Sequence, residues 1–344
     1  MAITTTSADV LGPQISLPGC ADRCGGVKVP YPFGISQGCF LSEKFYIHCD
    51  QSFQPPKPFL GRSKNNLPVS NITLEGGELV IMVYIGKDCY NKDGERIYHF
   101  DPRLRLVDFN IATDRNKFTA VGCDTYATLS GYRGEIRYVT GCVSYCNVID
   151  DSFGASSSDQ SCSGVGCCQT SIPSGLKNFT VSLTSYYNHT YVNDFNPCSY
   201  AFVVEESQFK FSKASFQELN STDMVPMVLN WDIGKESCDE AKKRSNFTCK
   251  ANSKCVDASD GSGYFCQCLP GYEGNPYHPN GCQDGYIASE TGCDKVCGSS
   301  QSESHSQSDQ SHRTLVATGT MLPLKLKMCE EKVEYEFVDS SFGE

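Results

Sequence analysis

The stretch from Cys20 to Asp50, CADRCGGVKVPYPFGISQGCFLSEKFYIHCD, decides the fold of the N-terminal part of the chain. It places four cysteines, at positions 20, 24, 39 and 49, around a rigid segment, Val29-Pro30-Tyr31-Pro32-Phe33-Gly34. Each proline fixes its own φ and disfavours helix at the residue before it, whereas Gly34 is free to turn. The pattern predicts a disulfide-stapled loop or edge strand whose two aromatic rings are either buried or displayed, and burial is the commoner fate of such rings.

Cysteine usage defines the class of protein. The chain of 344 residues has 21 cysteines, spread over nearly its whole length, and is long enough for two or three domains. This abundance indicates a disulfide framework formed in an oxidising compartment. A zinc protein is the competing interpretation, but the six histidines are scattered and the Cys-x3-Cys pairs lack a second set at ribbon-like spacing. Five N-x-S/T sequons agree with a secreted glycoprotein: Asn71, Asn178, Asn188, Asn220 and Asn246.

The N-terminal residues 1–19 show no basic region followed by an apolar run, so no signal peptide is visible. This conflicts with the cysteines, which carry more weight, and we expect an N-terminus that is incomplete or wrongly assigned. The longest apolar runs are far shorter than the roughly 20 residues that a membrane-spanning helix needs. We therefore expect no membrane-spanning segment in this chain.

The motif CGGVKVPYPFG, followed by a cysteine and then by FYIHC, closely resembles the galacturonan-binding domain of plant wall-associated receptor kinases. The resemblance implies binding of pectin in the cell wall. The phrases CSGVGCCQTSIP (residues 162–173) and NPCSYAF (residues 196–202) resemble the segment that follows this domain in the same family. Because Cys167 and Cys168 cannot easily bond each other without strain, each is expected to reach a separate partner.

The six cysteines from Cys238 to Cys282 are separated by ten, five, ten, one and thirteen residues. With the run CQCLPGYEGNPY, this unit resembles an epidermal growth factor-like module. The resemblance implies the pairs Cys238–Cys255, Cys249–Cys266 and Cys268–Cys282. So small a unit has little core and needs such staples. The residues before Cys238 lack the acidic cluster of calcium-binding modules, and we expect no metal and no cofactor.

Together these features predict a mainly β, disulfide-rich, multi-domain extracellular protein with a small growth factor-like module near its C-terminus and a disordered tail. The predicted divisions are an N-terminal tail (1–19), a galacturonan-binding-like domain (20–140), a second cysteine-rich domain of the wall-associated-kinase type (141–235), the growth factor-like module (236–283) and a low-complexity, disordered tail (284–344). Cys293, Cys297 and Cys329 in the tail leave one cysteine unpaired.

Strand-like alternation begins at Asn71 and continues to Val121. It predicts strands at NITL, LVIMVYI and LRLVDFNI (residues 104–111), and further short strands at FTAV and at residues 136–140. Leu104 and Leu106 alternate with Arg103 and Arg105, which predicts one buried face and one basic, solvated face.

Charge is divided unevenly along a chain whose net charge is −11. Residues 20–140 have fifteen Lys and Arg against thirteen Asp and Glu, whereas residues 141–344 have fourteen against twenty-six. A partner that is an anionic polymer is therefore expected on the first domain, although so small an excess is also ordinary for a solvated surface.

We predict no enzyme activity. The sequence has no Gly-rich phosphate loop, HRD or DFG motif of a kinase. A pectin hydrolase needs converging carboxylates, and the isolated Asp88, Asp101 and Asp124 form no motif.

The predicted function is binding of pectin, mainly homogalacturonan, at the cell wall, without catalysis. The alternative is an extracellular protein-interaction module that binds a protein partner through the growth factor-like unit; no nucleic acid is expected as a partner. A polymer with a carboxylate on each sugar calls for an open, basic groove with rings for stacking. The candidate contact residues are Tyr31, Phe33, Arg62, Lys64, Arg103, Arg105, Arg115 and Lys117.

Overall fold

The computed structural model describes residues 14–62, 67–148, 162–258, 263–289 and 292–295. Within them the protein is built from antiparallel sheets and very short helices, so the prediction of a mainly β, disulfide-rich fold is confirmed. The helices are η1 (Glu43–Phe45), η2 (Glu75–Gly77), η3 (Glu206–Gln208), α1 (Ser215–Glu218) and α2 (Cys238–Ala241). No helix in the described ranges has the length and apolar character needed to span a bilayer.

Two sheets pack face to face and form a sandwich. The six-stranded sheet contains, in spatial order, β14 (Ser163–Val165), β15 (Cys167–Ser171), β11 (Asn116–Val121), β17 (Cys198–Glu205), β7 (Gly86–Tyr90) and β8 (Arg96–Phe100). The four-stranded sheet contains β13 (Ile136–Tyr145), β12 (Asp124–Arg133), β16 (Asn178–Thr184) and β9 (Arg103–Arg105). In β16 buried Phe179, Val181 and Leu183 alternate with residues of the open face, because one face of the sheet covers the core and the other meets solvent.

A third sheet joins the sandwich to the N-terminal part of the chain. Its strands are β10 (Asn110–Ile111), β18 (Met224–Asn230), β6 (Glu78–Tyr84) and β5 (Val69–Thr73). The buried side chain of Asn116, at the start of β11, accepts a hydrogen bond from the Val228 N–H (2.9 Å) and donates one to the Val228 carbonyl (2.7 Å). The Asn116 amide thus pairs with Val228 as a backbone peptide group would, and it links the six-stranded sheet to the third sheet.

The cysteine-rich stretch at the N-terminus forms two small hairpins. They are β1 (Arg23–Cys24) with β2 (Val27–Lys28), and β3 (Ile47–Asp50) with β4 (Lys57–Leu60). Disulfides Cys20–Cys39 and Cys24–Cys49 staple them. The ring of Phe33 is buried and meets Phe45 and Trp231 edge to face, with ring centroids 5.0 and 5.3 Å away.

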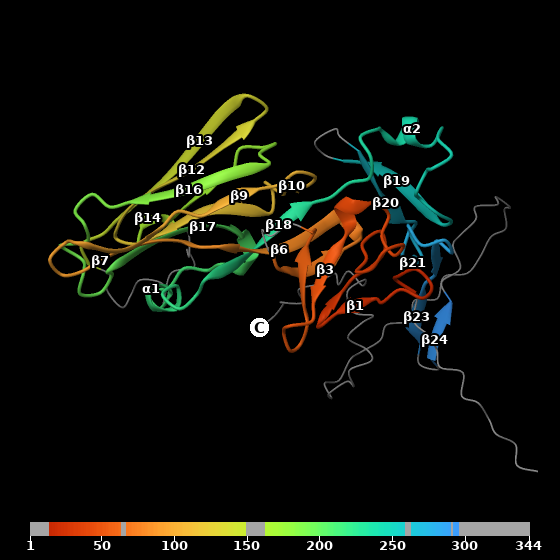
Figure 1. The fold of residues 1–344 in the computed structure, drawn as a ribbon, viewed down its shortest axis with the longest axis horizontal. Coiled ribbons are helices and arrows are strands. Elements are labelled where there is room, and N and C mark those ends of the chain that lie inside the picture. The colour runs from red at the N-terminus through yellow and green to blue at the C-terminus, as the bar shows by residue number, and fades with distance from the viewer. Residues whose placement is uncertain (1–13, 63–66, 149–161, 259–262, 290–291, 296–344) are drawn as a thin grey trace, which may run out of the picture.

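The growth factor-like module docks directly on this aromatic cluster. Its strands are β19 (Ser253–Asp257), β20 (Tyr264–Cys268), β21 (Tyr272–Gly274) and β22 (Cys282–Asp284), followed by the hairpin β23 (Tyr286–Ser289) and β24 (Gly292–Lys295). Tyr277 packs against Trp231, and Asn275 Nδ2 donates to the carbonyls of Ile15 and Tyr31, both at 2.6 Å. Figure 1 shows the result, an elongated molecule with the sandwich at one end and β1, β3 and the module together at the other.

Nine disulfides cross-link the described residues. The six upstream of residue 200 join the twelve cysteines there among themselves: Cys20–Cys39, Cys24–Cys49, Cys89–Cys198, Cys123–Cys146, Cys142–Cys168 and Cys162–Cys167. Vicinal Cys167 and Cys168 therefore reach separate partners, as predicted. The module contains Cys238–Cys255, Cys249–Cys266 and Cys268–Cys282, the pairs that the resemblance implies.

Three expectations need correction. Residues 140 and 141 do not divide the sheets, because the boundary falls inside β13 and because β6 and β7 pair with β18 and β17 from the other side. The strand expected over residues 104–111 is two short strands, β9 and β10, with a bend between them. Residues 284–295, assigned to the tail, include the end of β22 and the hairpin β23–β24, while the disorder expected for 296–344 lies outside the described residues.

Candidate functional site

The open face of the four-stranded sheet places Arg103 and Arg105 beside residues from distant parts of the chain. Leu104 and Leu106 are buried and the two arginines are exposed, as the alternation predicts. Arg105 lies opposite Asn178 in the β9–β16 register, and Asn178 Oδ1 accepts a hydrogen bond from the Tyr132 N–H (3.2 Å). Residues directly opposite each other in an antiparallel pair share a face, so these side chains form one row across three strands.

Three adjoining depressions run along this edge of the molecule, with volumes of about 390, 460 and 590 Å³. The first contains Arg103, Arg105 and Tyr132 in its wall; it shares Arg105, Tyr132 and Asn178 with the second and Tyr84 with the third. We call this continuous path the basic track. Its charged and aromatic lining residues are Phe53, Lys57, Phe59, Tyr84, Arg103, Arg105, Tyr132, Arg133, Lys177 and Phe179.

The charge of the basic track is one-sided. Five cations line it, at positions 57, 103, 105, 133 and 177, and none of its lining residues is Asp or Glu. The track ends at Arg133 and Gly175, where the second depression meets a further one of about 880 Å³ that is lined by four carboxylates, those of Glu78, Asp114, Asp232 and Asp257. Within the described part of the chain, Arg103 and Arg105 form no ion pair, so their guanidinium groups are available to a ligand. On a chain with a net charge of −11, such a path attracts anionic groups locally.

The other predicted cations lie elsewhere. Arg62 pairs with Glu43 (2.9 Å) and covers the ring of Tyr46. Arg115 is held between two carboxylates, those of Glu78 and Glu205, and Lys117 faces Glu206 at 3.7 Å. These three residues do not line the basic track. Lys64 lies outside the described residues.

The two predicted stacking rings do not lie on the track either. Phe33 is 1% exposed and belongs to the aromatic cluster around Trp231, so it cannot present its ring to a sugar. Tyr31 is half-buried beside the growth factor-like module, where its carbonyl accepts from Asn275, and burial raises the pKa of its hydroxyl. The rings that the track does expose are Phe53, Tyr84 and Tyr132.

Sequence reasoning missed Lys57, Arg133 and Lys177. Only strand pairing brings Arg133 and Lys177 to Arg105, and Lys57 lines a different depression, which adjoins the first at Tyr84. Tyr132 and Arg133 end β12, and Lys177 immediately precedes β16, the strand between β12 and β9. The one available signal is the Tyr-Arg-Gly sequence at 132–134, a cation and a ring placed at a turn.

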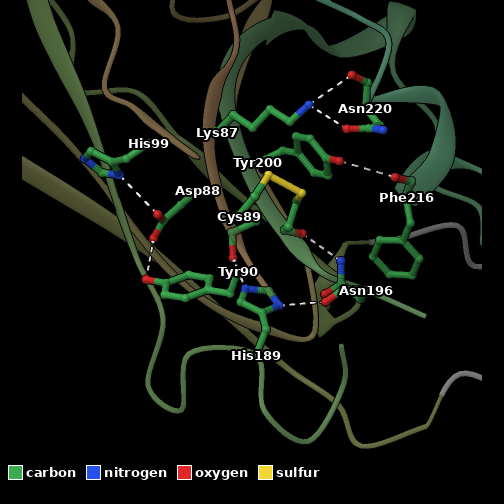
Figure 2. The surroundings of a disulfide bond; sticks show 12 residues. Lys87, Asp88, Cys89, Tyr90, His99, His189, Asn196, Tyr200, Phe216 and Asn220 are labelled. Atoms are coloured by element: carbon green, nitrogen blue, oxygen red, sulfur yellow. Dashed lines mark hydrogen bonds and ion pairs between the residues drawn. A yellow bond between two sulfur atoms is a disulfide. The ribbon is translucent and has the colours of Figure 1, made fainter. Parts of the chain in front are cut away.

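A buried polar network surrounds the disulfide Cys89–Cys198 in the sandwich (Figure 2). His189, which is fully buried, hydrogen-bonds the Asn196 carbonyl through Nδ1 (2.7 Å) and Ser199 Oγ through Nε2 (2.8 Å). This is the spacing of a nucleophile and its base, but Ser199 is also fully buried and bonds Thr125, so no substrate reaches it. The pair stabilises the core.

The isolated carboxylates also have structural partners. Asp88 is buried and bonds Tyr90, Arg96 and His99. Asp124 accepts from Ser185 Oγ and from three backbone N–H groups, of Tyr186, Tyr187 and His189. Burial acts to raise the pKa of Asp124, but these hydrogen bonds together outweigh it and hold the pKa below its ordinary value.

We expect His189 to make the protein less stable as the pH falls below about 6.5, the ordinary pKa of histidine. Burial lowers the pKa of His189 in the folded state and outweighs the opposing hydrogen bond to Asn196 and the charges of Asp124 and Asp88. Between the two pKa values, His189 is protonated in the unfolded chain and neutral in the folded chain. The free energy of unfolding therefore decreases as the pH is lowered, by at most about 1.4 kcal/mol per pH unit, until the folded pKa is reached.

The measurement is the free energy of unfolding by denaturant between about pH 7.5 and about pH 5, compared with His189→Gln and with His48→Gln at an exposed position. The slope should flatten in the first variant and persist in the second. An unchanged slope in His189→Gln would contradict the assignment. The Asp124 contribution is lost only at lower pH, below about 3.9, because its folded pKa is depressed.

Two family models match the sequence. The model described as "Wall-associated receptor kinase galacturonan-binding" matches residues 20–83, and the model described as "Wall-associated kinase" matches residues 159–238. The first segment contributes Phe53 and Lys57 to the basic track, and the second contributes Lys177 and Asn178.

Three curated relatives from Arabidopsis thaliana are similar over the same region. Wall-associated receptor kinase 2 is 40% identical over 268 residues, wall-associated receptor kinase 5 is 37% identical over 274, and wall-associated receptor kinase 1 is 32% identical over 270. Each alignment covers 77% of this chain and 34% of the relative, so the chain spans about a third of the length of these kinases. No solved structure matches the chain.

Proposed function

Because the chain is homologous to the wall-associated receptor kinases over its N-terminal 77% and contains two of the family's domains, we propose that it is an extracellular, non-catalytic module that binds acidic cell-wall polysaccharide along the basic track. De-esterified homogalacturonan is the proposed ligand. The observation that carries the proposal is the five-cation lining of a continuous path that contains no carboxylate.

The shape of the track suits a polymer better than a small molecule. It consists of shallow depressions that follow one another rather than a single deep pocket, and it extends from β4 across β9 to the end of β12. A polygalacturonate strand offers one carboxylate per sugar, and arginine can bind a carboxylate through two parallel hydrogen bonds. Exposed Tyr84 and Tyr132 supply flat faces for the C–H side of sugar rings.

Replacing Arg103 and Arg105 together by alanine should weaken binding to polygalacturonate by up to about thirtyfold, since each exposed ion pair contributes at most about 1 kcal/mol. Retention of the full chain is measured on polygalacturonate and on fully methyl-esterified polymer, at about 0.1 M and about 1 M salt. We expect retention only on the charged polymer, and only at low salt.

The matched control is the double variant Arg62→Ala with Lys92→Ala, which removes the same charge from two exposed sites off the track. It should bind like the wild type. Because Asn178 is a sequon that lines the track, all proteins are also tested with Asn178→Gln, so that a glycan there cannot mask binding. An equal loss of retention in both double variants, or equal retention on both polymers, would contradict the proposal that the basic track binds polygalacturonate. With no retention on either polymer, the protein-interaction hypothesis would replace this one.

A further inference from the structure

A second surface of the sandwich displays five tyrosines that no function described so far uses. Their side chains are between 38% and 71% exposed: Tyr126, Tyr145, Tyr186, Tyr187 and Tyr191. Tyr126 lies 6.1 Å from Tyr186, and Tyr187 lies 6.3 Å from Tyr145 and 5.5 Å from Tyr191, measured between ring centroids. In the β12–β13 register, Tyr126 faces Val143, which points to the same open face as Tyr145 two residues on. The five rings therefore form one surface, which we call the tyrosine patch.

Buried polar residues fix the loop that contains three of the five tyrosines. Buried Asp124 accepts hydrogen bonds from the N–H groups of Tyr186 (2.9 Å) and Tyr187 (3.0 Å), and the buried ring of His189 fixes the following turn. A loop ordered in this way keeps its exposed rings in one arrangement, so that a ligand does not have to order them on binding. A contiguous exposed aromatic surface usually indicates that a ligand or partner covers it.

The sequence places a glycan acceptor between two tyrosines of the patch. Asn188-His189-Thr190 is a sequon, and Asn188 follows Tyr187 directly and precedes Tyr191 by three residues. Asn188 is exposed, with a left-handed φ of 51°, and no hydrogen bond to its side chain is found within the described ranges. The amides of Asn71, Asn178 and Asn220 each have a partner: Thr73, the Tyr132 N–H and Lys87.

We propose that Asn188 is N-glycosylated and that the inner sugars of its glycan lie on the tyrosine patch. The oligosaccharide comes from a polyprenyl diphosphate donor. The bond between its C1 and the diphosphate oxygen breaks, a C1–Nδ2 bond forms, Nδ2 loses one proton, and the polyprenyl diphosphate leaves. The C–H faces of the attached pyranose rings then cover Tyr187 and Tyr191, the rings nearest to Asn188 in sequence, and remove their apolar area from water.

The experiment uses the full chain, directed into the secretory pathway of plant cells by an added signal peptide, and maps both glycan occupancy and tyrosine access. Glycopeptide mass spectrometry should find a glycan on Asn188. Nitration by tetranitromethane, mapped by peptide, should rise severalfold at Tyr187 and Tyr191 in Asn188→Gln. Enzymatic removal of the glycan from the folded wild type should give the same rise without a substitution that could disturb the loop.

Asn246→Gln is the matched control. Asn246 is also an exposed sequon, but its neighbour Phe247 is stacked on buried Tyr264 and no tyrosine of the patch is near it in sequence. Nitration of Tyr187 and Tyr191 in this variant should equal that of the wild type. An unmodified Asn188, or equal nitration with and without its glycan, would overturn the proposal. The outcome does not depend on whether the basic track binds a polysaccharide.

Discussion

Replacing Trp231 with alanine is expected to lower the free energy of unfolding by about 3–5 kcal/mol, the range for removing a large buried aromatic side chain. Trp231 is 2% exposed and is the only tryptophan of the chain. Its ring contacts those of Phe33, Phe45 and Tyr277, with centroids 5.3, 5.8 and 5.6 Å away, and its Nε1–H donates to the Glu78 carbonyl at 3.1 Å. The substitution leaves a cavity where the N-terminal cysteine-rich stretch, the third sheet and the growth factor-like module meet.

The measurement is denaturant unfolding at fixed pH, and the control is Ile97→Ala, because Ile97 is 65% exposed on the edge strand β8. The control should change the free energy by less than about 0.5 kcal/mol. If Trp231→Ala lowers the free energy of unfolding no more than the control does, the contacts of Trp231 do not hold the growth factor-like module in place.

Removing the disulfide Cys89–Cys198 by a double alanine substitution is expected to cost about 4.7 kcal/mol. The bond joins β7 to β17 across a sequence separation of 109 residues, the longest among the nine disulfides of the described residues. In the chain-entropy description, a loop of about 100 residues closed by a disulfide removes about that much freedom from the unfolded state. Alanine is chosen over serine because both positions are buried and a hydroxyl there would need a partner.

The internal control is the bond Cys162–Cys167, which closes only five residues of sequence separation. The same description assigns it about 2 kcal/mol, so the two double variants should differ by more than 2 kcal/mol in denaturant unfolding. Equal losses would mean that loop closure does not determine the stabilisation by these bonds.

The periodic parts of the fold could be predicted from the sequence, because alternation of apolar and polar residues reports which face of a strand is buried. Arg103 and Arg105 were expected on a solvated face and lie on one. In contrast, β12 reads DTYATLSGYR, in which Asp, Ser and Gly favour turns, yet it forms a ten-residue strand because two neighbouring strands hydrogen-bond to it. Tertiary pairing overrides weak local preference there.

The candidate site could be predicted only in part, because a site depends on which distant residues meet. Arg115 looked as free as Arg105, but Glu78 and Glu205 approach it from two other strands and neutralise it. Phe33 lies in a proline-rich segment that could have displayed it, but the approach of Trp231, almost 200 residues later, buries it. The sequence around Arg115 and around Phe33 does not reveal these distant partners.

The junction around Trp231 also determines how the molecule responds to a pull. Only seven residues separate the end of β18 from the start of α2, and the first three of them are buried, so there is no slack linker to extend. Asp232 is paired with Lys44, and Ile233 is hydrogen-bonded to Tyr264 in both directions. A force on the sandwich therefore reaches the growth factor-like module through packed, paired and hydrogen-bonded residues rather than through an extensible linker.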